Sequence, residues 1–330
     1  MQIRVGVPDL EKNRHIVIGV YDLFKNLLEH NGSVVKFFEV DELNSEALDY
    51  FLSFGYGINQ KIVKERGSGI RYISIWDDLH YHTEESRTSR FQYFGTADKL
   101  LLTYQKAFLE MDEYEDFQHK SQWFPWWVPN EFAEGSKEIG FENRERSVLL
   151  TGRISDSYPL RQHVFSMTDS IDGLAIHAHP GYGMRKTPHT FDFTEIHESY
   201  IERLRSCQCA LQIGAKAPLD KYQLAKYFEI PAAGCVLVAT GAPFLNELGF
   251  VPEENYIEID ENELLNGLDE VIPRILERED LGEIARAGWE LVSQRHCTGN
   301  RVESIIEIIA KDYYDNNEFL DEELFYHHFR

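Results

Sequence analysis

The chain has 330 residues, more than one hydrophobic core normally organises, so we expect two domains. Hydrophobic residues make up 43% of the sequence and aromatic residues 13%, which excludes an intrinsically disordered chain. The 56 acidic residues outnumber the 33 basic ones, for a net charge of −23. This charge excludes a broad nucleic-acid surface, because binding a phosphate backbone requires a basic one. It leaves room for a small anion held by a few arginines and lysines.

Strand and helix patterns alternate through the first part of the chain. Strands are expected at 2–7, 33–40, 50–54, 70–76 and 98–104, and helices at 16–27, 57–66 and 84–95. The aromatic segment WFPWWVPNEF (123–132) breaks this pattern, and we interpret it as core or hinge packing between domains, with the lining of an acceptor groove as the alternative. Such an alternation predicts a parallel sheet covered by helices on both faces.

A second series of the same kind follows. Strands are expected at 147–152, 173–179, 208–214, 234–240 and 255–260, and helices from residue 158 and at 194–206, 220–233, 262–278, 281–294 and 299–313. The sequence therefore predicts an α/β protein of two Rossmann-like domains facing across a cleft. We place the first domain at 1–135, a linker at 136–146, the second domain at 147–300, and at 301–330 a helix and tail that return to the first domain. Ligands of such sheets bind at the carboxyl ends of the strands.

The sequence also bears on the compartment. Its four cysteines form no Cys-x-x-Cys pair and no disulfide framework, so we expect reduced thiols and a cytoplasmic location. The start, MQIRVGVPDL, lacks the charged and then apolar pattern of a signal peptide. The longest uncharged stretch, 230–246, contains two prolines and two glycines, so no transmembrane segment is expected.

An anion site is predicted where the strand at 147–152 ends. Thr151, Gly152 and Arg153 follow one another there, and Arg161 lies in the first turns of the next helix. Free amides and the helix dipole at such a turn attract an anion, and arginines add charged hydrogen bonds to phosphate oxygens. Neither a GxGxxG nor a GxxxxGK[ST] motif is present. The alternative is that both arginines are ordinary surface residues.

Glu229 stands in the stretch KYFEIPAAGCVLVAT, an apolar helix that leads through Gly234 into a buried strand. A buried carboxylate needs a partner, because an unpaired buried charge is costly. That partner is either Lys226, one turn before it, or a ligand.

The same stretch carries a resemblance. Together with SCQCALQIG before it, and APFLNELGFVPEENYIEID and AGWELVSQRHCTGNRVESIIEII after it, it resembles the C-terminal half of GT-B glycosyltransferases, and within them the CgeB-like branch of glycosyl transferases group 1 (GT4-like). The matching positions are Lys226, Phe228, Glu229, Gly234, and a closing His296, Thr298 and Arg301. The likeness covers about residues 147–310, while the first half agrees only in architecture.

The resemblance implies a donor site. In that family the glutamate at the position of Glu229 binds the ribose hydroxyls of a nucleotide-diphosphate sugar. Many relatives have a second glutamate eight positions earlier, close to the donor sugar, whereas this chain has Lys221 there. GT-B enzymes generally stabilise the leaving diphosphate with basic side chains and helix dipoles, so the resemblance implies that basic side chains bind it here instead of a catalytic metal. The expected donor-binding residues are Arg153, Arg161, His179, Tyr182, Lys221, Tyr222, Lys226, Tyr227 and Glu229.

The acceptor side is expected to come from the first domain. IWDDLHYH follows the strand at 70–76, and we assign catalytic roles there to Asp78 and His80, with Asp77 as a rival carboxylate. Asp77 or Asp78 could equally cap the next helix. His177 and His179 form a His-x-His at a strand end, an arrangement in which metal hydrolases hold zinc or iron. In the resembling fold this loop would instead flank the nucleobase.

The predicted function is transfer of a hexose-type sugar from a UDP-sugar, with a GDP-sugar second, to an acceptor hydroxyl. The resemblance implies retention of configuration and no cofactor besides the donor. The acceptor is a glycan, a lipid-linked group or a protein, and no nucleic-acid partner is expected. Two alternatives stay open: a metal-dependent hydrolase built on His177 and His179, and a non-catalytic sugar-nucleotide-binding scaffold of the same fold.

Overall fold

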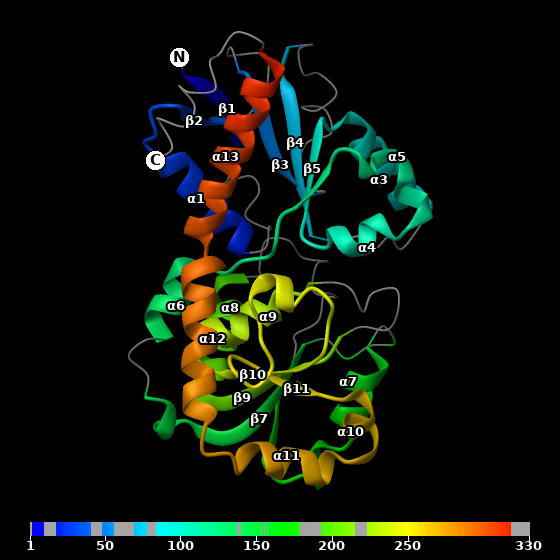
Figure 1. Cartoon of the computed structure of the whole chain (residues 1–330), viewed down its shortest axis with the longest axis vertical. Helices are drawn as coiled ribbons and strands as arrows, with labels where there is room; N and C mark the ends of the chain where they lie inside the picture. The colour runs from blue at the N-terminus through cyan, green and yellow to red at the C-terminus, as the bar shows by residue number, and fades with distance from the viewer. Residues whose placement is uncertain are drawn as a thin grey trace.

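The fold was analysed in a computed structural model of the chain. The structure describes residues 2–9, 18–40, 48–55, 69–77, 84–136, 140–152, 154, 156, 158–178, 193–214 and 223–317. Two lobes follow one another along the long axis of the molecule, each built around one sheet (Figure 1).

The first lobe is built on a parallel sheet of six strands in the order β2-β1-β3-β4-β5-β6. The strands are β1 (Ile3–Pro8), β2 (Val35–Val40), β3 (Tyr50–Phe54), β4 (Arg71–Trp76), β5 (Lys99–Leu102) and β6 (Ser121–Trp123). The five expected strands are confirmed. β6 was not expected, because its three residues are all partly exposed and show no alternation of buried and exposed positions.

The second lobe holds a parallel sheet of five strands in the order β11-β10-β9-β7-β8. The strands are β7 (Glu145–Gly152), β8 (Leu174–Ala178), β9 (Cys207–Gln212), β10 (Val236–Thr240) and β11 (Ile257–Ile259). The expectation of two Rossmann-like sheets is therefore confirmed. The exact domain boundaries stay a prediction; β7 begins at Glu145, inside the stretch taken as the linker.

The helices connect and cover these strands. In the first lobe they are α1 (Ile18–Glu29), α3 (Glu84–Thr96), α4 (Gln105–Leu109) and α5 (Glu115–Gln118). In the second they are α6 (Asn130–Ser136), α7 (Pro159–Ser166), α8 (Phe193–Ser206), α9 (Lys226–Ala232), α10 (Glu261–Asn266), α11 (Leu268–Leu276) and α12 (Leu281–Arg295), and α13 (Thr298–Asn316) follows. The single helix expected at 262–278 is two helices that meet at Gly267, and the helix expected at 57–66 lies outside the described residues. None of the described helices is long and apolar enough to cross a membrane.

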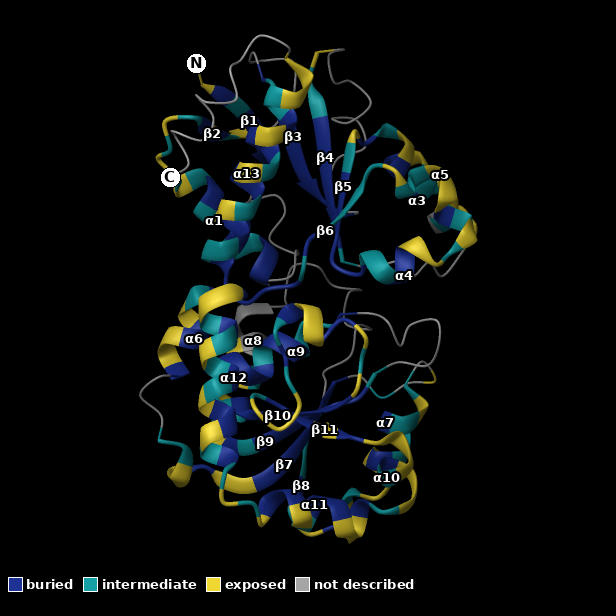
Figure 2. Cartoon of the chain, viewed as in Figure 1, coloured by how far each residue is buried: buried dark blue, intermediate teal, exposed yellow. Residues whose placement is uncertain are grey.

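Two segments cross between the lobes side by side. Residues 124–129 lead from β6 into the second lobe, and α12 returns through His296 and Cys297 into α13 (Figure 1). The Val128 amide donates to the His296 carbonyl at 3.0 Å, and the Thr298 amide donates to the Val128 carbonyl at 2.9 Å. The Trp-rich segment is buried here, which confirms its interpretation as interdomain packing. The strands at the centre of each lobe are mostly buried, dark blue in Figure 2.

Helix α13 runs back along the first lobe and packs on α1, so the expectation of a returning C-terminal helix is confirmed. Near the end of α13, the buried Asp312 carboxylate accepts from Tyr50 Oη at 2.9 Å and from Arg71 Nε at 2.6 Å and Nη2 at 3.1 Å. Tyr50 and Arg71 are the first residues of β3 and β4. The end of the helix is thus fixed at the amino ends of β3 and β4.

Candidate donor-binding site

The site begins at the carboxyl end of β7. Gly152 adopts a φ of +99°, a conformation that residues with a Cβ rarely take. A Cβ at this position would overlap Lys226 Nζ and come within 2.9 Å of Arg161 Nη1. Glycine is therefore required twice here, for the turn and for the close approach of two cationic side chains.

Arg161 is held in place by its surroundings. It lies in the first turns of α7, its exposed fraction is 3%, and its Nη2 donates to the Ile213 carbonyl at 3.0 Å, directly after β9. Its guanidinium stacks 4.0 Å above the ring centre of Tyr158. Arg161 is thus no surface arginine; it is a fixed positive charge at the carboxyl ends of β7 and β9.

Lys226 is the first residue of α9 and reaches the same place. Burial, followed by the positive charge of Arg161, lowers its pKa from 10.5 to about 7, while the negative charge of Glu229 acts in the opposite direction. Two cations that face each other in a partly buried position repel, and a bound anion would relieve that repulsion. The arrangement favours a phosphate over Gly152.

Glu229 lies one turn further along α9, beside Tyr200 of α8. Burial raises the pKa of Glu229 above its usual 4.5, while Lys226 and then Tyr200 lower it. In turn, burial and then the charge of Glu229 raise the pKa of Tyr200 well above 10. Glu229 therefore interacts with Lys226, as one of the two interpretations holds, and it also lies next to the phosphate position proposed from Gly152.

The side chain of His177, near the carboxyl end of β8, lies close to Tyr200 and Lys226. Its ring lies 5.8 Å from that of Tyr200. Burial first, and then the positive charges of Arg203 and Lys226, lower its pKa below 6.5. A neutral imidazole beside two cations can bind a ligand by hydrogen bonds without adding charge.

Tyr227, the second residue of α9, faces the core. Its side chain is buried in the core, edge-on to Phe244 at 5.3 Å between ring centres. Burial raises the pKa of Tyr227 to about 12, while Gln212 and Arg161 lower it. The ring therefore supports α9 from beneath, and its part in donor binding stays a prediction.

Seven of the predicted site residues lie outside the described residues: Asp78, His80, Arg153, His179, Tyr182, Lys221 and Tyr222. Their roles stay predictions. Within the described part of the chain, no three His, Cys, Asp or Glu side chains gather in a way that could hold a metal ion. Asp77, the rival carboxylate, directly follows β4 and is partly buried.

The closing residues of the resemblance lie elsewhere. His296, Thr298 and Arg301 sit at the interdomain crossing. Arg301 Nη2 donates to His296 Nδ1 at 2.9 Å, so the ring proton is on Nε2, which donates to the Leu248 carbonyl at 2.9 Å. Burial and Arg301 lower the pKa of His296 to about 4, in keeping with a neutral ring. These residues fix the junction of α12 and α13.

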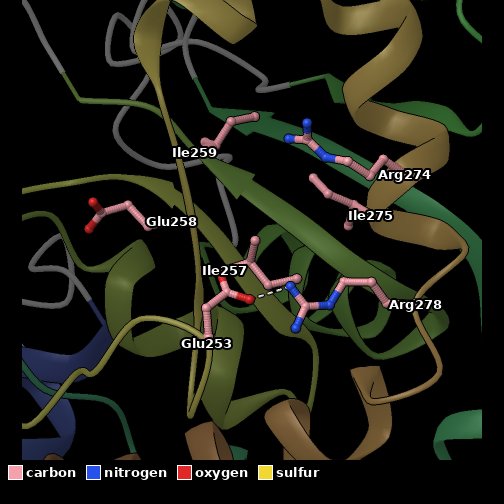
Figure 3. A pocket seen from close by; sticks show the side chains of 7 residues that line it. All are labelled: Glu253, Ile257, Glu258, Ile259, Arg274, Ile275 and Arg278. Atoms are coloured by element: carbon pink, nitrogen blue, oxygen red, sulfur yellow. Dashed lines mark hydrogen bonds and ion pairs between the residues drawn. The ribbon is translucent and has the colours of Figure 1, made fainter.

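A pocket of about 290 Å³ lies on another side of the second lobe, between the edge strand β11 and helix α11 (Figure 3). It is lined by Glu253, Ile257, Glu258, Ile259, Arg274, Ile275 and Arg278. Arg278 pairs with Glu253 and Asp280, and Arg274 pairs with Glu263. None of the predicted site residues lines it, and its arginines already have carboxylate partners.

Comparison with known proteins places this geometry in context. No family model matches the chain, and no curated protein matches it in sequence. Solved structures do match. Sucrose-phosphate synthase from Thermosynechococcus elongatus is similar over 96% of this chain and all of that one, with a TM-score of 0.61 and 12% identity. HepE from Anabaena in complex with UDP and glucose is similar over 94% of this chain and all of that one, with a TM-score of 0.55 and 12% identity.

An alpha-glucosyltransferase in complex with UDP and a 13-mer DNA matches over the same shares of the two chains, with a TM-score of 0.60 and 12% identity. The chain has the GT-B fold. This likeness, over nearly the whole of each chain, confirms the architecture implied by the resemblance. The narrower likeness to the CgeB-like branch stays a prediction.

Sequence reasoning missed Tyr200. Its approach to Glu229 depends on how α8 packs beside α9, 29 positions further on, and no motif links the two. Lys226 and Arg161 both belonged to the predicted donor set, but the structure was needed to show that they meet over Gly152.

Proposed function

We propose that the chain is a glycosyltransferase that transfers a hexose-type sugar from a UDP-sugar to an acceptor hydroxyl. Two findings support this. The fold is that of HepE and of an alpha-glucosyltransferase whose structures contain UDP. In addition, Arg161 and Lys226 meet over Gly152 at the carboxyl end of a strand, where sheets of this kind bind ligands. The meeting of these two cations carries the proposal.

The chemistry follows from the charges. In sugar transfer the bond between the anomeric carbon and the diphosphate breaks, and negative charge develops on the departing diphosphate. Arg161 and Lys226 would stabilise that charge without reorganising, because both are already held in place. Glu229, with two acceptor oxygens, would bind the ribose hydroxyls.

Several finer points belong to the same proposal. GDP is the second candidate nucleotide, transfer proceeds with retention, and basic side chains take the place of a catalytic metal. Asp78 or His80 would approach the reacting centre from the first domain. The net charge of −23 speaks against a nucleic-acid acceptor, although one protein of this fold has been solved with DNA.

Isothermal titration with UDP, GDP, ADP, dTDP and CMP in the presence of EDTA tests the donor site. We expect UDP to bind best, and Glu229→Ala to weaken it about tenfold to a hundredfold through loss of charged hydrogen bonds. UDP without ribose hydroxyls should bind wild type and Glu229→Ala equally. Glu263→Ala, on α10 in the same lobe, is the matched control and should leave affinity unchanged.

Turnover is tested by release of UDP from UDP-glucose, with the anomeric configuration of the product followed by NMR. If no nucleotide binds while zinc or iron raises the melting temperature, the hydrolase built on His177 and His179 replaces this proposal. Tight UDP binding without turnover of any UDP-sugar would instead support the non-catalytic scaffold.

A further inference from the structure

The peptide groups around Trp126 are bound from two sides where the chain crosses between the lobes. Arg301 Nε donates to the Pro125 carbonyl at 2.7 Å, and Arg301 Nη2 donates to the Trp126 carbonyl at 3.2 Å. From the other side, the Trp126 amide donates to Gln223 Oε1 at 2.6 Å. The first crossing segment is thus fixed both to the returning helix and to a residue of the second lobe 97 positions away.

Gln223 stands three positions before Lys226, the first residue of α9. Its exposed fraction is 4%. Its Nε2 is buried and has no hydrogen-bond partner among the described residues, so within them the side-chain amide of Gln223 bonds through Oε1 to the Trp126 amide. Leu224, next to it, packs against the core cluster that spans both lobes and also against a cluster of first-lobe residues that includes Tyr104 and Phe108.

The start of helix α9 lacks a side-chain cap. The helix has seven residues, and Ala225 at its N-cap makes no side-chain capping bond. Further along, Phe228 packs against His296 of the crossing at 5.0 Å between ring centres. The start of the helix is therefore held by the burial of Tyr227 and Phe228 on its core side, and ahead of its first residue by Gln223 on Trp126 and the packing of Leu224.

We propose that Gln223 is a positioning residue: by binding the Trp126 amide it fixes the start of α9, and with it the place of Lys226 over Gly152 beside Arg161. The inference rests on the donor site proposed above. A displacement of the helix start moves a charge that must contact the diphosphate, and small displacements of such groups are costly to binding.

The test compares UDP affinity and thermal stability for Gln223→Met and Gln223→Glu. Methionine keeps the length of the side chain and removes the acceptor, whereas glutamate keeps an oxygen at the place of Oε1. We expect Gln223→Met to weaken UDP about tenfold, and Gln223→Glu to recover affinity to within about threefold of wild type. Gln223→Asn shortens the side chain by one methylene and so moves the acceptor oxygen away from the Trp126 amide. If Gln223→Met does not fold, the UDP affinity of Gln223→Asn is compared with that of wild type in its place.

Thr298→Val is the control for a purely structural effect. It removes the bond from Thr298 Oγ1 to Asp22 Oδ2 at 2.5 Å, in the same crossing but away from α9. It should lower the melting temperature and leave UDP affinity unchanged. The inference is overturned if Gln223→Met binds UDP like wild type while Glu229→Ala does not, or if Thr298→Val weakens UDP as much as Gln223→Met. If wild type binds no nucleoside diphosphate, the proposed function and this inference fall together.

Discussion

The pKa of Lys226 makes the donor site sensitive to pH in a defined direction. Burial and Arg161 hold this pKa at about 7 in the ligand-free protein, so the ammonium loses its proton in the physiological range. A diphosphate over Gly152 stabilises the charged form and raises the pKa again. Binding at pH above 7 must therefore take up a proton, and affinity must fall as pH rises.

The size of the effect follows from the ionised fraction. With a pKa of about 7, roughly half of the Lys226 side chains are charged at pH 7 and about 1% at pH 9. If the complex keeps the lysine charged throughout, the dissociation constant rises about 50-fold between these two pH values. Proton uptake should be about 0.5 per ligand at pH 7 and about 0.9 at pH 8.

Titration calorimetry in buffers of different ionisation enthalpy measures this uptake directly. UDP-glucose is the right ligand, because its diphosphate lacks the terminal ionisation that a phosphate monoester shows near pH 6. Lys226→Arg is the matched variant: arginine stays charged at every pH used, so its affinity should not vary with pH and its proton uptake should vanish.

Other groups around Lys226 set the remaining controls. Arg161 stays charged, and the lowered pKa of His177 and raised pKa of Tyr200 keep both neutral from pH 7 to 9. Glu229 has a raised pKa, so Glu229→Gln is measured as well. A wild-type affinity that is constant from pH 7 to 9, or a pH dependence that persists in Lys226→Arg, would refute the reasoning.

Three further predictions concern stability and site geometry. Gly152→Ala, with φ at +99° and no room beside the two cations, should lose about 1–3 kcal/mol of unfolding free energy and most UDP affinity; unchanged affinity by calorimetry would contradict the site. Asp312→Asn removes the carboxylate that accepts from Arg71, so urea unfolding should show a loss of about 1–3 kcal/mol with UDP affinity intact. Lys106→Ala breaks an exposed ion pair with Glu247 and should change stability by less than about 1 kcal/mol; a larger loss would mean that this pair holds the lobes together.

Much of the fold could be predicted because its strands are buried on both faces. Runs such as 147–152 and 234–240 are almost continuously apolar, and helical patterns separate them, which leaves a parallel sheet as the solution. β6 escaped prediction because three partly exposed residues carry no period. The break at Gly267 escaped because the apolar spacing continues across it from α10 to α11.

The site was predictable only in part, for a different reason. Arg161, Lys226 and Glu229 stand in the first turns of helices that follow strands, and topology alone brings such helix starts to the carboxyl edge of a sheet. Tyr200 belongs to the middle of a helical pattern, and its position against Glu229 depends on how two helices pack. Periodicity reports which face of a helix is buried and says nothing of which side chain it meets.

At the crossing between the lobes, the same contacts serve both the fold and the proposed site. The same few peptide groups near Trp126 bind Arg301 from the returning helix and Gln223 from the segment that begins α9. A residue that only joined two domains could be placed anywhere along their boundary, yet Gln223 lies three positions before the lysine that faces Arg161 over Gly152. The proposed donor site and the junction of the lobes therefore share contacts. Variants at the crossing are accordingly expected to separate into those that change stability alone and those that also change the affinity for a nucleoside diphosphate.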